Sequence, residues 1–139
     1  MDGREALPVS RSLPTATHPL RWGGVLACAA AILVASVVDP GAGSRTLLGV
    51  GLSVYLHLAG YAGLAGAVGY ALLRADARGL LIAAGVAVGY GVAVELVQAP
   101  LPYRTASALD AQVNAAGAAV GAALWRAVAP GSALDRTPT

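Results

Sequence analysis

Two common residue types are missing from this chain of 139 residues: it has no Phe and no Lys, so all of its positive side-chain charges are Arg. Charge is scarce as well, at 12% of residues, while 57% are hydrophobic. A soluble domain usually has about 25% charged and about 45–50% apolar residues. The composition therefore favours a membrane protein. The net charge of +2 and the lack of a basic patch argue against a nucleic-acid partner.

Cysteine is almost absent too. Cys28 is the single cysteine and lies within an apolar stretch, so it has no partner for an intrachain disulfide. The apolar segments also contain no His-x-x-x-His pair and no cysteine pair that would suggest a metal site. We therefore predict no metal and no cofactor, and interpret Cys28 as a small buried hydrophobe.

Four apolar segments make up most of the chain, at residues 22–38, 47–73, 80–101 and 110–129. A helix needs about 17–25 apolar residues to cross a bilayer, and open strands cannot satisfy their backbone in lipid. We predict an all-α, multi-pass bundle of four transmembrane helices in the cell membrane. Residues 1–21 and 130–139 are polar and predicted to be disordered tails. Segment 22–38 is longer than a signal-peptide core, and no clear cleavage site follows it, which favours an uncleaved helix.

The arginines predict the orientation of the bundle, because short cytoplasmic loops are enriched in positive charge. With both termini in the cytoplasm, only Arg45 and Arg104 lie on the outer side. The other seven lie inside: Arg4, Arg11, Arg21, Arg74, Arg78, Arg126 and Arg136. We therefore expect an N-in, C-in topology.

Small residues predict how the helices pack. Gly85 and Gly89, and likewise Gly117 and Gly121, are each spaced one helical turn apart, which allows close approach of another backbone. Such a face serves either a homodimer or packing within the chain. The high content of Gly and Ala favours packing within the chain, and a homo-oligomer remains the alternative.

A series of polar residues interrupts the third and fourth segments near their outer ends. A charged side chain at the centre of a bilayer costs about 2.5–3.5 kcal/mol on insertion scales, so an ionisable residue there indicates a functional site. At 1.5 Å per residue, these side chains reach a similar depth, and two more approach from the second segment. The candidate ligand-binding residues are His57, Tyr61, Glu95, Gln98, Arg104, Asp110 and Asn114.

An architectural interpretation competes with the functional one. Asp110 is suited to cap the fourth helix, and Gln98 and Asn114 are suited to interhelical hydrogen bonds. Glu95 fits this interpretation least well, because a carboxylate in an apolar setting needs a partner or a shifted pKa.

The spacing of these residues resembles the VanZ family of small membrane proteins. The pattern is Glu95-x2-Gln98-x3-Pro102-x-Arg104-x5-Asp110-x3-Asn114-x2-Gly117, preceded by His57-x3-Tyr61-x2-Leu64. It covers roughly residues 47–125. The resemblance implies a polytopic membrane protein whose shared polar residues gather at one membrane face, with a link to cell-envelope or glycopeptide-resistance phenotypes.

The chain departs from the family at one place. Where the family often has an Asp-Lys pair before its histidine, this chain has Ser53 and Val54. The departure makes Arg104 the expected counter-ion of Glu95 or Asp110.

Three functions follow from the sequence. The first is the binding of a membrane lipid or a lipid-linked ligand, with Arg104 engaging an anionic headgroup. The second is a membrane enzyme on lipid-linked substrates, with Glu95 or His57 as base, but no nucleophile lies beside a base. The third is a purely architectural membrane subunit. The sequence favours binding.

Overall fold

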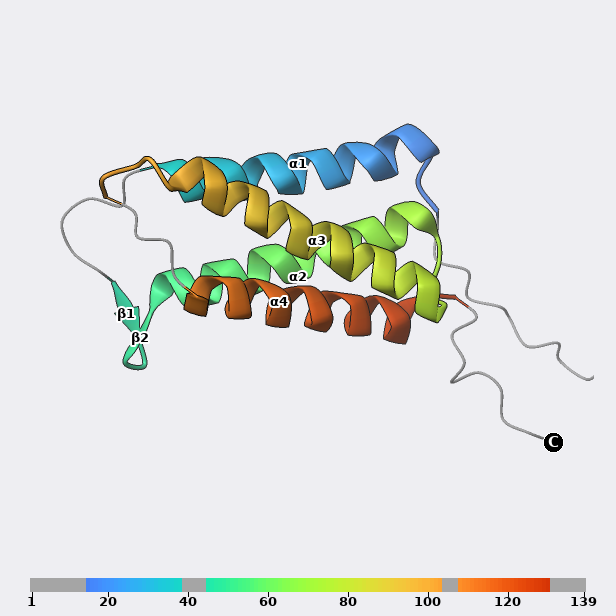
Figure 1. Ribbon diagram of the computed structural model, residues 1–139. Helices are drawn as coiled ribbons and strands as arrows, with labels where there is room; N and C mark the ends of the chain where they lie inside the picture. The colour runs from blue at the N-terminus through green and yellow to red at the C-terminus, as the bar shows by residue number, and fades with distance from the viewer. Residues whose placement is uncertain (1–14, 39–44, 104–107, 131–139) are drawn as a thin grey trace, which may run out of the picture.

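A computed structural model of the protein describes residues 15–38, 45–103 and 108–130. Four long helices fill these ranges: α1 (His18–Val37), α2 (Leu52–Leu72), α3 (Ala77–Gln98) and α4 (Ala108–Val128). Consecutive helices run in opposite directions, so the start of α1 and the end of α4 lie at the same end of the molecule (Figure 1). The prediction of a helical protein with four helices is confirmed.

Three of the helices in the described ranges, α1, α2 and α3, are long and apolar enough to cross a membrane. Their 20 to 22 residues correspond to about 30 Å of helix, the thickness of the hydrocarbon core. Leu26, Leu81 and Leu96 are 70%, 73% and 71% exposed, as expected for side chains that face lipid. α4 has 21 residues but is not apolar enough to join these three, because it contains Asp110, Gln112, Asn114 and Arg126.

The second apolar segment begins differently from the expected helix. Residues 46–51 form a short antiparallel hairpin, β1 (Thr46–Leu47) and β2 (Val50–Gly51), and α2 starts only at Leu52. The turn residues Leu48 and Gly49 both have positive φ, at 53° and 79°. That conformation is the one a two-residue hairpin turn requires, and Gly adopts it readily.

The other helix ends also differ from the predicted boundaries. α1 starts at His18, inside the expected tail, with Pro19 in the first turn, where a proline is tolerated. The rest of both expected tails, residues 1–14 and 131–139, lies outside the described residues. α3 ends at Gln98: the next residue, Ala99, still has helical backbone and donates to the Glu95 carbonyl, but Pro100 has no N–H to continue the series of hydrogen bonds.

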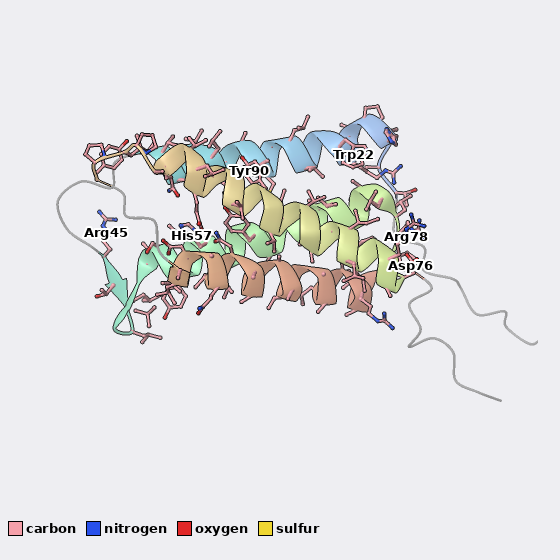
Figure 2. All side chains as sticks on the ribbon, in the orientation of Figure 1. Trp22, Arg45, His57, Asp76, Arg78 and Tyr90 are labelled. Atoms are coloured by element: carbon pink, nitrogen blue, oxygen red, sulfur yellow. The ribbon has the colours of Figure 1, made fainter. Side chains whose placement is uncertain are left out.

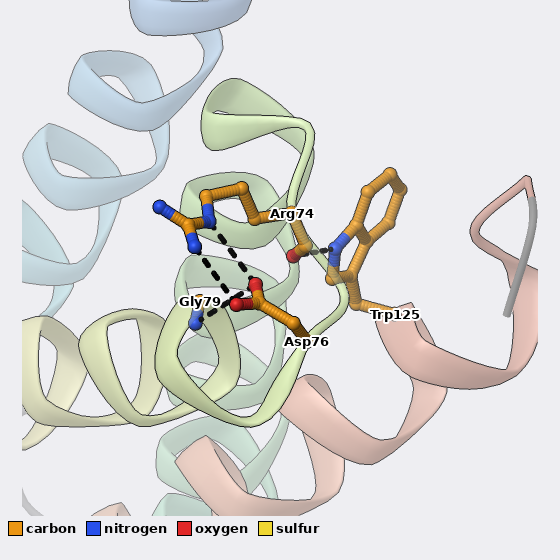
Figure 3. A network of polar contacts seen from close by, with 4 residues as sticks. All are labelled: Arg74, Asp76, Gly79 and Trp125. Carbon is orange, nitrogen blue, oxygen red and sulfur yellow. Dashed lines mark hydrogen bonds and ion pairs between the residues drawn. The ribbon is translucent and has the colours of Figure 1, made fainter. Parts of the chain in front are cut away.

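The turn between α2 and α3 is held by polar contacts of its own and by one contact with α4 (Figure 3). Asp76 caps α3 by accepting from the Gly79 amide at 3.3 Å, and it pairs with Arg74 at 2.8 Å. The hydrogen bond from Arg74 lowers the pKa of the Asp76 carboxyl below its usual value. The indole of Trp125 donates to the Arg74 carbonyl at 2.7 Å, which fixes the end of α4 to this turn.

The closest helix packing joins α2 and α4. A Cβ atom added at Gly117 would lie 2.5 Å from the carbonyl oxygen of Leu58, and one added at Gly121 would overlap the carbonyl oxygen of Ala62. These two glycines therefore bring α4 onto the backbone of α2. Gly85 and Gly89 have no atom within 4 Å of such a Cβ, so they pack against nothing in the described chain.

We predict that Gly121→Ala destabilises the protein by about 1–3 kcal/mol, because the added methyl group overpacks the contact with α2. Unfolding in detergent, followed by circular dichroism, measures this loss.

Gly89→Ala is the matched control, since it adds the same group to another helix where the space is open. It should leave stability unchanged or raise it by up to about 1 kcal/mol. Equal losses in the two variants would contradict the close α2–α4 contact.

Candidate functional site

A hydrogen bond joins α2 to α4 inside the bundle. Nδ1 of His57 lies 2.9 Å from Oδ1 of Asn114, and Asn114 is only 3% exposed. In this contact the amide oxygen accepts when the ring carries its proton on Nδ1. The convergence of the second and fourth segments expected from the sequence is therefore present at these two residues.

Tyr61 lies one turn further along α2 on the same face. Its ring stacks on His57 with centroids 6.1 Å apart, and the residue is 0% exposed. α3 approaches at Gly91, where an added Cβ would lie 3.2 Å from Asn114 Nδ2 and 3.2 Å from Tyr61 Cε1. The absence of a side chain at Gly91 thus lets three helices meet at one place.

Glu95 follows Gly91 by one turn of α3. Its Oε1 atom is buried and makes no hydrogen bond, and the buried Tyr61 hydroxyl makes none either. Both Glu95 and Asp110 lie close enough to Tyr61 to interact with it electrostatically. Buried polar atoms are nearly always paired, so two such atoms without a partner, on the packed helices α2 and α3, indicate a place for a water, an ion or a ligand.

We define the polar cluster as His57, Tyr61, Glu95 and Asn114. His57, Glu95 and Asn114 lie within six residues of the helix ends at the end of the bundle that carries the hairpin, or about 5–9 Å along the axes. Figure 2 shows His57 at this end with Arg45 on the hairpin, and Asp76 and Arg78 at the opposite end.

Of the other three candidate residues, the structure describes Gln98 and Asp110, and it places both outside the polar cluster. Gln98 is turned to α1, where its amide donates to the Ser36 carbonyl at 2.8 Å, so it ties α3 to α1. Asp110 lies in the first turn of α4, which begins at Ala108, and so does not occupy the N-cap. Arg104 lies outside the described residues.

A hollow lies at the opposite end of the bundle. It has a volume of about 260 Å³ and is lined in part by Tyr70, Leu73 and Trp125. The polar groups of its aromatic residues are already used, because the Tyr70 hydroxyl accepts from Ala16 and the Trp125 indole donates to Arg74. The polar cluster is the better candidate site, since it holds polar atoms that lack a partner.

Two residues that matter here are hard to identify from the sequence. Gly91 precedes Glu95 by four residues, which places it on the same helical face, but the abundance of glycine in α3 hid its role. Ser36 acts through its backbone carbonyl, which carries no residue-specific pattern.

No protein-family model, no curated protein and no solved structure matches this chain.

We predict that His57 and Asn114 are energetically coupled. In a double-mutant cycle with His57→Ala and Asn114→Ala, the coupling should be about 0.6–1.7 kcal/mol, the range for hydrogen bonds inside membrane proteins. Reversible unfolding in mixed micelles provides the four free energies.

Gln98→Ala combined with Asn114→Ala serves as the control cycle, since Gln98 bonds to α1. Its two effects should add within about 0.3–0.5 kcal/mol. A coupling no larger than the control would show that the His57–Asn114 bond contributes no specific energy.

Proposed function

We propose that this chain is a VanZ-like integral membrane protein that binds an amphiphilic or lipid-linked ligand through the polar cluster in the outer half of a four-span bundle. The observation that carries the proposal is the pair of buried atoms without partners, Tyr61 Oη and Glu95 Oε1, among helices that present leucine to their surroundings. A ligand with a polar group and an apolar tail suits a polar site opening from such a surface.

The proposal includes a membrane crossing by α4. Its polar residue Asn114 is buried against α2 and α3, and its glycines lie against α2, so neighbouring helices cover much of its polarity. Polar residues in transmembrane helices face the bundle interior in this way. Arg21, Arg74, Arg78 and Arg126 lie at the end away from the hairpin, which supports an N-in, C-in orientation under the positive-inside rule.

An architectural role is the second candidate, and a specific observation favours it. The bonds from His57 to Asn114 and from Gln98 to Ser36 each join two helices and would lock the bundle without any ligand. Under that alternative, removing a polar side chain impairs assembly before it impairs binding.

We predict that Glu95→Gln weakens ligand retention at least about tenfold, while the protein still inserts and stays folded. Native mass spectrometry of the protein purified in mild detergent counts the copurified lipid-sized adducts. Asp76→Asn is the control, because Asp76 lies at the opposite end and Asn preserves the cap. Failure of Glu95→Gln to assemble would support the architectural role, and unchanged adducts would refute the binding site.

The topology has its own test. A cytoplasm-active reporter fused to either terminus should give a signal, and a reporter active only outside the cytoplasm should be silent at both. If the reporters place the two termini on different sides of the membrane, an odd number of helices crosses it. That result is expected if α4 does not cross the membrane.

A further inference from the structure

The unpartnered atoms of the polar cluster share a chemical property: they accept hydrogen bonds. Oε1 of Glu95 is a carboxylate oxygen, and the oxygen of the Tyr61 hydroxyl accepts hydrogen bonds as well. Only the Tyr61 hydroxyl can also donate. The site is therefore matched to a group that supplies several N–H or O–H donors.

The negative charge of Glu95 also favours a ligand group that carries hydrogen-bond donors. The polar cluster holds Glu95, and in the described ranges the only Arg at this end is Arg45, which is exposed on the hairpin. A carboxylate that has a buried oxygen and no counter-charge among the described residues is costly in a medium of low dielectric constant. A water molecule would satisfy the hydrogen bonds but leave the negative charge uncompensated. A cationic ligand group supplies both the hydrogen-bond donors and the positive charge.

We infer that the ligand group bound between Tyr61 and Glu95 is a primary ammonium group carried by an amphiphile. This inference rests on the proposed binding function and specifies the chemistry of its ligand. An ammonium has three donors and no acceptor, which complements the oxygen atoms of Glu95 and Tyr61. Its alkyl chain would leave the site along the leucine-rich outer surface of the helices. The described residues contain no group of three His, Cys, Asp or Glu side chains arranged for a metal ion, which makes a metal the weaker candidate.

Three amphiphiles with the same alkyl chain test this assignment on the full-length protein in nanodiscs. Dodecylammonium carries a positive charge and three donors, dodecyltrimethylammonium carries the charge without donors, and dodecyl phosphate carries the opposite charge. We expect dodecylammonium to bind about tenfold or more tightly than the trimethyl compound, a difference of about 1.4 kcal/mol. Binding is measured by native mass spectrometry after release from the discs.

Two variants tie the binding to the site. Tyr61→Phe removes only a hydroxyl that makes no hydrogen bond, so it should fold normally and lose the preference for dodecylammonium. Glu95→Gln should weaken dodecylammonium binding about tenfold. Tyr103→Phe is the matched control, because the Tyr103 hydroxyl donates to the Val37 carbonyl outside the polar cluster, and this variant should bind like the parent.

The outcomes separate the inference from the proposed function. Tighter binding of dodecyl phosphate that depends on Tyr61 and Glu95 would overturn the ammonium assignment and keep the binding site. Binding of all three compounds that ignores both substitutions would overturn the inference and the site together. If the ammonium preference holds, nanodiscs of phosphatidylethanolamine and phosphatidylcholine identify the source of the group. If only the phosphatidylethanolamine discs reduce dodecylammonium binding, the natural source of the ammonium group is the membrane lipid. If neither lipid reduces that binding, the source is a separate amphiphile.

Discussion

The close contact between α2 and α4 is the constraint on which the rest of the molecule depends. Gly117 and Gly121 let the α4 backbone rest on Leu58 and Ala62. At this separation the short side chain of Asn114 reaches His57. A wider spacing would leave both groups without a partner inside the bundle, where each missing hydrogen bond costs about 1–3 kcal/mol. The polar cluster thus exists because two glycines remove the side chains that would hold the helices apart.

The polar cluster combines groups that are paired with groups that are not. His57 and Asn114 satisfy one another, which fixes the position of the Tyr61 ring stacked on His57. Tyr61 and Glu95 each keep a buried oxygen atom without a partner. An arrangement that served only to lock helices would satisfy these atoms as well, because an unpaired buried polar group opposes stability. Rigid support beside unsatisfied acceptors is the pattern expected of a binding site.

The sequence predicted the helices well and their ends less well, for physical reasons. Long apolar segments must be helical in lipid, so the four apolar segments of the sequence predicted four helices. The hairpin at Leu48 and Gly49 escaped notice because Leu rarely adopts positive φ. Of the candidate residues, His57 and Asn114 meet as helical spacing suggested, whereas Gln98 turns to α1. Spacing along one helix gives the face of a residue, but only the packing of the other helices decides which neighbour it meets.

The polarity of α4 also bears on how the protein enters the membrane during synthesis. α1, α2 and α3 are apolar enough to cross a membrane, and α4 is not. It follows α2 and α3 in the chain, so they are made before Asp110, Gln112 and Asn114. If α4 crosses the membrane as proposed, Gly117 and Gly121 let it pack on α2, and the packed helices cover Asn114. In this view the order of the helices along the chain is itself a requirement for assembly, and a permuted chain that began with α4 would lose its path into the bilayer.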